Sequence, residues 1–179
     1  FFFMDIRGFT PLSEQYKSNP EGLTKVINKF LTPMTDLIMK MDGTIDKYMG
    51  DCIMAFWNAP IDCPDHAYKA VKTAVLIKKR LKELNQENAF GHEIKIGIGI
   101  NSGEALVGNM GSDQRFDYSV IGDAVNLASR LEGTSKNYDT TIIIGEETVK
   151  RIDKPKWAFR LVDKVQVKGK SEKVSIYTV

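Results

Sequence analysis

Cysteine and histidine are scarce in this sequence, with two of each among 179 residues. Cys52 and Cys63 fit neither the spacing of a metal site nor a framework of disulfides, which favours a protein from a reducing compartment. His66 and His92 have no partner at metal-ligand spacing, and we expect both to be surface or packing residues. The scarcity argues against a metal centre built from cysteine and histidine.

Long apolar runs and a charge imbalance are also missing. No stretch approaches the roughly 20 apolar residues that a membrane-spanning helix needs, and the apolar start at residues 1–4 is too short for a signal peptide. Twenty-five Lys and Arg residues against 23 Asp and Glu residues give a formal net charge of +2. No overall field therefore favours nucleic acid or a membrane surface, and we expect neither as a direct partner of this domain.

The length favours a single domain spanning residues 1–179. The hydrophobic content of 42% and the charged content of 27% are ordinary for a globular protein. No repeat, low-complexity stretch or linker interrupts the chain. The sequence opens inside an expected strand without an initiator methionine, so we expect a fragment of a longer protein.

Hydrophobic periodicity predicts mixed strands and helices. Ser102 and Gly103 are expected to turn the strand before them back into the segment 104–108 as a hairpin. The expected elements are a strand at 1–4, a helix over 23–41, a hairpin at Gly50 and Asp51, a helix over 67–84, a strand over 94–100, a helix over 123–136, a strand at 141–145, a helical turn at 146–151 and a closing hairpin around 168–173. This order predicts an α+β, ferredoxin-like sandwich in which helices cover one face of an antiparallel sheet.

Two acids are candidate metal ligands. Asp5 ends the first strand, Gly8 lets the backbone approach a ligand, and Thr10 followed by Pro11 is a good helix N-cap and first-turn pair. In a ferredoxin-like sheet the first strand lies beside the hairpin whose tip carries Asp51, so the two acids could converge. Two carboxylates together with substrate phosphates are the usual ligands of magnesium. The alternative is that Asp5 only caps its own loop.

Two further pairs of residues and one lysine could either take part in function or be ordinary surface residues. Lys47 and Asp51 could form a surface ion pair, worth only about 0–1 kcal/mol, or could hold a ligand. Asn126 and Arg130 lie four residues apart on a helix and could serve phosphoryl chemistry, or could form a solvated face. Lys168 on its own is a basic hairpin tip.

Five blocks together narrow these alternatives: "FMDIRGFT", "DKYMGD", "GINSGEALVGNMGS", "YSVIGDAVNLASRLE" and "VKGK". In this order they resemble the class III adenylyl and guanylyl cyclase catalytic domain, and most of all its bacterial branch. The resemblance covers essentially the whole chain. It implies the class III nucleotidyl cyclase fold and the conversion of ATP to 3′,5′-cyclic AMP and pyrophosphate.

The resemblance also assigns the metal ligands and a first group of substrate contacts. Asp5, Asp51 and the Ile6 carbonyl would bind two Mg²⁺ or Mn²⁺ ions in each site. The loop after the first strand would contact the substrate through Gly8, Phe9 and Thr10.

The remaining roles concern the nucleotide. Lys47 matches the lysine that reads the adenine edge, and Ser119 matches the residue paired with it, which is commonly Asp or Thr. Asn126 would position the ribose, and Arg130 would stabilise charge on the α-phosphate. Lys168 would hold the β- and γ-phosphates.

Family members work as dimers in which the metal acids come from one chain and the base, ribose and transition-state residues from the other. The resemblance therefore implies a homodimer with shared active sites. It also implies a cytoplasmic domain, where ATP is available, and is compatible with a membrane anchor elsewhere in the full-length protein.

Two rival functions remain. A guanylate or mixed-specificity cyclase is the first, although guanine-specific members tend to carry Glu at the Lys47 position and Cys at the Ser119 position. A non-catalytic nucleotide-binding or dimerisation domain is the second. That reading expects a lost metal acid, asparagine or arginine, and none is lost here.

Overall fold

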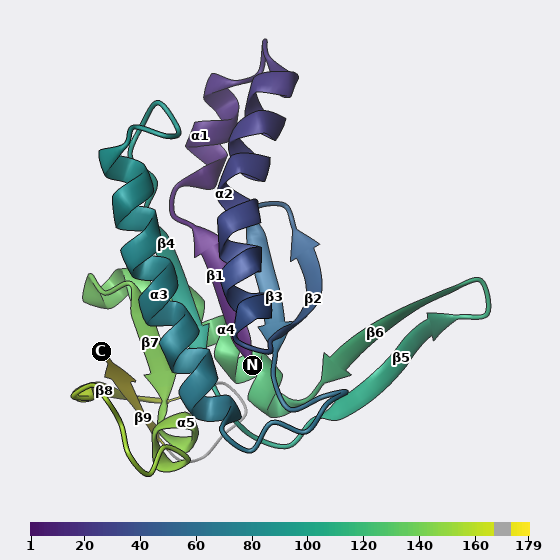
Figure 1. The fold of residues 1–179 in the computed structure, drawn as a ribbon, viewed down its shortest axis with the longest axis vertical. Coiled ribbons are helices and arrows are strands. Elements are labelled where there is room, and N and C mark those ends of the chain that lie inside the picture. The colour runs from purple at the N-terminus through teal and green to yellow at the C-terminus, as the bar shows by residue number, and fades with distance from the viewer. Residues whose placement is uncertain (167–172) are drawn as a thin grey trace.

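The computed structural model describes residues 1–166 and 173–179 (Figure 1). The elements in chain order are β1 (Phe2–Ile6), α1 (Phe9–Gln15), α2 (Pro20–Lys40), β2 (Thr44–Met49), β3 (Cys52–Phe56), α3 (His66–Gln86), β4 (Ile96–Ile100), β5 (Leu106–Ser112), β6 (Arg115–Ile121), α4 (Asp123–Thr134), the 3₁₀ turn η1 (Ser135–Tyr138), β7 (Ile142–Gly145), α5 (Glu146–Lys150), β8 (Arg160–Gln166) and β9 (Lys173–Thr178). None of the helices in the described residues is long and apolar enough to cross a membrane.

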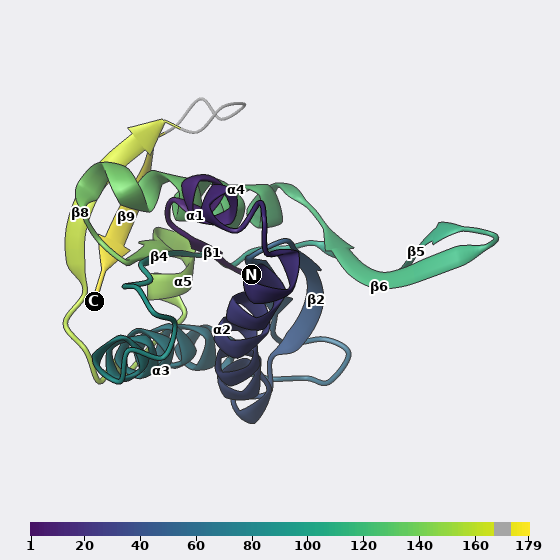
Figure 2. The same cartoon turned by 90° about the horizontal axis from the view of Figure 1, so that it is seen from above.

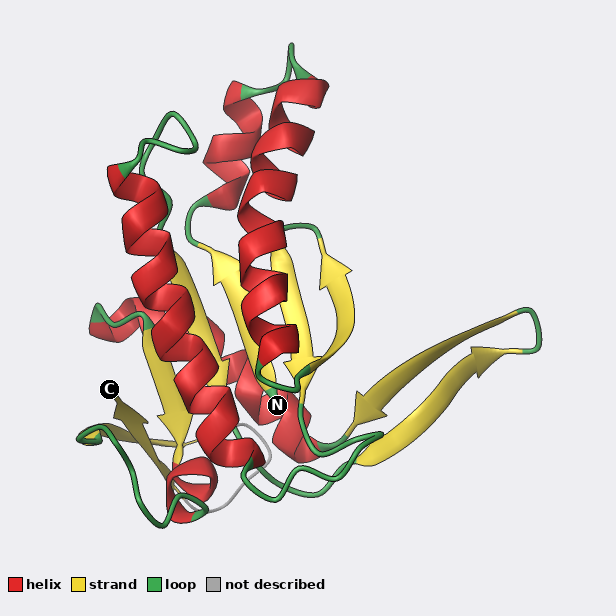
Figure 3. Cartoon of the chain, in the orientation of Figure 1, coloured by secondary structure: helices red, strands yellow, loops and turns green. Residues whose placement is uncertain are grey.

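The body of the protein is a seven-stranded sheet in the order β2-β3-β1-β4-β7-β9-β8 (Figure 3). All neighbouring strands are antiparallel except β4 and β7, which are parallel. The predicted α+β fold with a mainly antiparallel sheet is therefore confirmed. The first strand lies directly beside the β2–β3 hairpin, as the expected convergence of the two acids requires.

Helices cover both faces of this sheet. Phe2 and Met4 of β1 pack on one face in a core shared with α2 and α3. Phe3, between them, packs on the other face against Val125 and Ala128 of α4. Figure 2 shows α2 and α3 on one side of the sheet and α4 on the other. The prediction of helices on one face only is wrong, because β1 is apolar and buried on both faces.

The helix α4 approaches β4 very closely. A Cβ atom at Gly99 would lie 2.2 Å from the carbonyl oxygen of Ala128 and 2.2 Å from the amide nitrogen of Glu132. The glycines that alternate with isoleucines in β4 therefore give α4 the space to rest on the sheet. This close contact brings the end of α4 to the end of β1 that carries Asp5.

The strands β5 and β6 form a separate two-stranded arm that projects from the body (Figure 1). The prediction that segment 104–108 folds back on the isoleucine strand is wrong. Both edges of β4 are already occupied, by β1 and β7, so β5 pairs with β6 instead. The arm exposes large apolar side chains: Leu106 is 69% exposed, Phe116 62% and Ile121 61%.

Candidate functional site

Asp5 and Asp51 meet at one backbone amide. Asp5 lies near the end of β1, and Asp51 lies in the turn that joins β2 to β3. The Ile6 N–H donates to Asp51 Oδ2 at 3.0 Å and to Asp5 Oδ1 at 3.1 Å. Two acids 46 positions apart in the sequence are thus brought to one point, as a shared cation site would need. The role of the Ile6 carbonyl stays a prediction.

The carboxyl group of Asp51 is in an unfavourable place for a negative charge. The side chain is buried, with 7% of the residue exposed. Burial raises the pKa of Asp51 to about 7, and the hydrogen bond and charge of Asp5 add to the rise, while the amides of Asp51 and Ile6 oppose it. A divalent cation between the two acids would remove this repulsion, and hard oxygen donors suit Mg²⁺ or Mn²⁺.

A third acid, Glu132 of α4, belongs to the same pocket and was missed from the sequence. Burial and, to a smaller extent, the charge of Asp5 raise the pKa of Glu132 to about 7, while Arg7 and Lys136 oppose the rise. Glu132 lies one helical turn after the buried Ala128, so its place on the sheet side of α4 was a signal for a buried acid. Even so, no cluster of three or more His, Cys, Asp and Glu side chains in the described part of the chain is arranged to hold a metal. Ligands beyond the two acids would then be backbone carbonyls such as that of Ile6, substrate oxygens or water.

The pocket around these acids has a volume of about 480 Å³. Its lining includes three of the residues predicted to contact the substrate, Gly8, Phe9 and Thr10. The prediction that Thr10 is a helix N-cap is wrong, because α1 begins at Phe9 and its N-cap is Gly8, with φ of 70°. A left-handed φ favours glycine, and it turns the chain from β1 into α1 at the rim of the pocket.

We expect the cation-free protein to lose stability as the pH rises through about 7. The carboxyl of Asp51, whose ordinary pKa is 3.8, and that of Glu132, whose ordinary pKa is 4.5, both titrate near 7 in the fold. Between these values the folded state binds protons that the unfolded chain has released, so the free energy of unfolding falls with rising pH. Melting temperatures measured in a chelator from pH 5.5 to 8.5 should show this fall. The Asp51→Asn variant should show a shallower fall, and an equal slope would contradict the assignment.

The predicted base-reading residues, Lys47 of β2 and Ser119 of β6, are brought together through a residue that the sequence reading missed. Asp46 lies between them: its Oδ1 is 3.2 Å from Lys47 Nζ, and its Oδ2 accepts a hydrogen bond from Ser119 Oγ at 2.8 Å. Within the described residues Lys47 forms no ion pair with Asp51. The surface-pair reading of those two residues is therefore wrong.

Asn126 and Arg130 lie on the exposed side of α4, one turn apart. Neither lines the pocket that holds Asp5 and Asp51. The same holds for Lys47 and Ser119, so the described chain presents its predicted site residues in separate groups. Lys168 lies outside the described residues.

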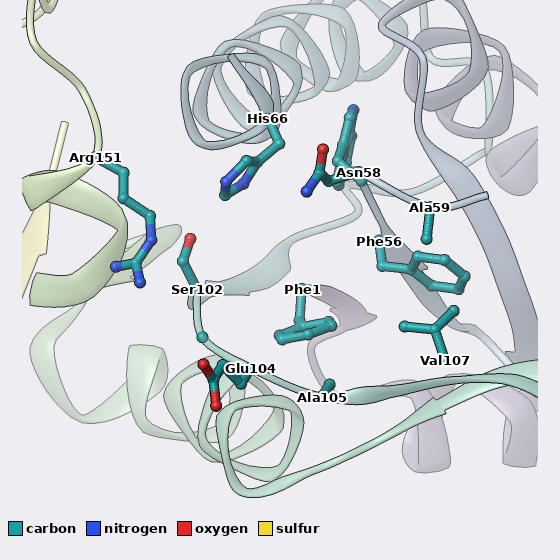
Figure 4. Close-up of a pocket in the computed structure, with 12 residues that line it drawn as sticks. Phe1, Phe56, Asn58, Ala59, His66, Ser102, Glu104, Ala105, Val107 and Arg151 are labelled. Carbon is teal, nitrogen blue, oxygen red and sulfur yellow. The ribbon is translucent and has the colours of Figure 1, made fainter. Parts of the chain in front are cut away.

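A different pocket, of about 550 Å³, lies where the arm joins the body (Figure 4). Its lining includes the polar side chains of His66, Glu104 and Arg151 and the ring of Phe1. Burial is the main cause that lowers the pKa of His66, and the nearby positive charge of Arg151 adds to it. None of the predicted site residues lines this pocket.

Comparison with known proteins gives a consistent result. Residues 1–179 match the family model described as "Adenylate and Guanylate cyclase catalytic domain". An adenylate cyclase of Anabaena cylindrica is 41% identical over 186 residues, which cover 99% of this chain and 36% of that protein. The chain thus spans about a third of the length of this curated relative.

Two solved structures are similar over nearly the whole chain. The crystal structure of the adenylyl cyclase CyaB from P. aeruginosa is 40% identical, with a TM-score of 0.86 and coverage of 98% of this chain and 90% of that one. The guanylyl cyclase Cya2 is 36% identical, with a TM-score of 0.83 and coverage of 98% and 88%. Both nucleotide specificities therefore occur on closely similar backbones.

Proposed function

The chain belongs to the adenylate and guanylate cyclase catalytic domain family, and from this premise we propose that it converts ATP to 3′,5′-cyclic AMP and pyrophosphate. The observation that carries the proposal is the convergence of Asp5 and Asp51 on the Ile6 amide. We take residues 1–179 to be one catalytic domain of a longer protein, which would work where ATP is present, in the cytoplasm. The family implies dependence on a divalent metal.

Asp5 and Asp51, with the Ile6 carbonyl, would hold two Mg²⁺ or Mn²⁺ ions per site. When bound, such ions acidify the ribose 3′-hydroxyl and neutralise charge on the phosphates. The protein's own task is then to hold the two carboxyl groups close together, where the charge of the cations would offset their repulsion. The buried amide of Ile6 and the turn that carries Asp51 serve that task.

The remaining residues position the nucleotide and stabilise developing charge. Asn126 would orient the ribose so that its 3′-oxygen faces the α-phosphorus in line with the departing pyrophosphate. Arg130 would place a guanidinium where negative charge grows on the α-phosphate. Lys168 would hold the β- and γ-phosphates.

Lys47 favours ATP over GTP. A lysine only donates hydrogen bonds, so it suits the N1 acceptor of adenine and opposes the N1–H donor of guanine. A glutamate would have the opposite preference. The backbone fold does not decide between ATP and GTP, since an adenylyl and a guanylyl cyclase match it almost equally well.

In the Lys47→Glu variant kcat/KM for ATP should fall at least about a hundredfold. The reason is that a glutamate carboxylate cannot donate a hydrogen bond to the N1 acceptor of adenine, as the lysine can. Turnover of GTP should fall less or rise. Binding of Mn²⁺, measured as the rise in melting temperature, should not change, since Lys47 lies apart from the Asp5 and Asp51 pocket. Lys25→Glu on the exposed side of α2 is the matched charge reversal. An unchanged preference for ATP would contradict the role of Lys47.

We propose a homodimer in which each site is completed across the interface. The separation of Asn126 and Arg130 from the pocket of the acids supports this. So do the exposed apolar side chains on β2 and the arm, because soluble monomers rarely present such surfaces without a partner. Those with the largest exposed fractions are Tyr48 at 48%, Met49 at 47%, Leu106 at 69%, Phe116 at 62% and Ile121 at 61%.

The direct test is to incubate the protein with ATP and either Mg²⁺ or Mn²⁺ and to measure cyclic AMP and pyrophosphate over a series of protein concentrations. Equal amounts of both products should form. The activity per chain should rise with concentration until the dimer is saturated. No product at concentrations where sedimentation shows a dimer would refute the proposed function.

A further inference from the structure

Asp46 is the extra residue of a β-bulge. In the pairing of β2 with β3, Ile45 lies opposite Ala55 and Lys47 lies opposite Met54, so two successive residues of β3 face three of β2. A bulge bends its strand and redirects a side chain that would otherwise follow the alternation of the sheet. Here the bulge directs the Asp46 carboxylate toward β6, and the side chain is 0% exposed.

The buried carboxylate joins two strands that belong to different sheets. Its Oδ2 accepts hydrogen bonds from Ser119 Oγ at 2.8 Å and from the Val120 N–H at 3.2 Å. Its Oδ1 lies 3.2 Å from Lys47 Nζ and accepts no hydrogen bond from the described residues. One side chain thus fixes both residues that are assigned to the base.

This arrangement decides which way the Ser119 hydroxyl can interact. A serine hydroxyl has one proton and two lone pairs, and its proton is normally free to rotate to the better acceptor. In this chain the proton is donated to Asp46. Ser119 can therefore only accept a hydrogen bond from any further partner.

We propose that Asp46 is a positioning residue that sets base preference by holding Ser119 as an acceptor beside the lysine donor. The proposal rests on the proposed function, in which Lys47 and Ser119 face the base. Adenine presents an acceptor at N1 and a donor in its 6-amino group, whereas guanine presents a donor at N1 and an acceptor at O6. A freely rotating serine could donate to O6, and Asp46 removes that option.

The test is the Asp46→Ala variant. It removes the carboxylate that takes the Ser119 proton, so the hydroxyl becomes free to donate to O6. The ratio of kcat/KM for ATP to that for GTP should then fall about tenfold or more, the effect of mispairing one buried hydrogen bond. Asp42→Ala is the control: this exposed acid pairs with Lys69 at 2.8 Å just before β2, and its removal should leave the ratio unchanged. An unchanged ratio in folded Asp46→Ala protein would overturn the proposal.

A double-mutant cycle separates positioning from general structure. In Ser119→Ala protein there is no hydroxyl to orient, so adding Asp46→Ala should leave the ATP-to-GTP ratio where Ser119→Ala alone places it. A further fall of the same size would show that Asp46 acts by another route. Lowered kcat for both nucleotides with a constant ratio would mean a structural role only, and would also overturn the proposal.

Unmodified protein gives a second measurement that does not depend on the folding of a variant. The 6-methylaminopurine and 6-methoxypurine riboside triphosphates are similar in size and both keep N1 as an acceptor, but only the first carries a donor at position 6. If Ser119 is held as an acceptor, the methylamino compound should bind about tenfold more tightly. Equal binding would overturn the proposal.

Dissociation constants measured by competition with a fluorescent nucleotide distinguish the two levels of inference. If the protein forms no cyclic AMP but binds ATP more tightly than GTP, and Asp46→Ala abolishes that difference, the proposed activity is refuted and the role of Asp46 is retained. If the protein forms cyclic AMP and Asp46→Ala binds ATP and GTP in the same ratio as the wild type, the activity is retained and the role of Asp46 is refuted.

Discussion

Replacing Asp51 by asparagine should lower the rate of cyclic AMP formation about a thousandfold or more. Assistance by a bound metal is worth several kcal/mol, and about 1.4 kcal/mol corresponds to a factor of ten in rate. Asparagine keeps the shape of the side chain and an oxygen that can accept from the Ile6 amide, which now donates to Asp51 Oδ2 at 3.0 Å. The loss would therefore report the missing charge. It is measured as the initial rate of cyclic AMP formation at saturating ATP and Mn²⁺.

Two controls make this result specific. Asp36→Asn removes an exposed carboxylate from α2 and should leave the rate unchanged. Mn²⁺ should raise the melting temperature of the wild type and of Asp36→Asn more than that of Asp51→Asn. If folded Asp51→Asn protein kept more than about a tenth of the rate, Asp51 would not be a metal ligand in the reaction.

Mixing two inactive variants should restore activity if the sites are shared. Asp51→Asn disables the metal half of a site, and Arg130→Ala disables the half that stabilises the transition state. When equal amounts exchange freely, half of the dimers are mixed and each mixed dimer has one intact site, so about a quarter of the wild-type activity should return. The rate is measured against mixing time and total concentration.

The matched control mixes Arg130→Ala with Asn126→Ala. Both substitutions lie on the same side of the proposed interface, so every site of a mixed dimer carries one defect and no activity should return. Recovery in this control would mean that the sites are not divided as proposed. No recovery in the first mixture, with mixed dimers verified by two different tags, would equally exclude shared sites.

Much of the fold could be predicted from local patterns. The long helices α2 and α3, the β2–β3 hairpin and the final strand pair follow from hydrophobic period and turn residues, and the structure confirms them. The partner of β5 could not be predicted, because it depends on which edges of β4 are already taken. The position of α4 on the second face likewise depends on the bare glycine surface of β4, which is a tertiary property.

The candidate site could be predicted where the order of the strands alone brings residues together. It could not be predicted where an irregularity of the backbone sets the direction of a side chain. Asp5 and Asp51 could be paired from strand order alone. Asp46 could not be singled out, since strand alternation says nothing of a bulge that turns its side chain toward β6. Glu132 carried a signal in its helical spacing, but its effect comes from its closeness to Asp5 in the fold.

The short β2–β3 hairpin carries Lys47 toward the arm and Asp51 toward β1, four positions apart in the chain. In the proposed dimer these two side chains serve different catalytic centres. A tilt of this hairpin on nucleotide binding would move Asp51 of the neighbouring centre through the five linked residues from Lys47 to Asp51. Communication between the two centres, seen as a Hill coefficient for ATP different from one, would then need no regulatory domain.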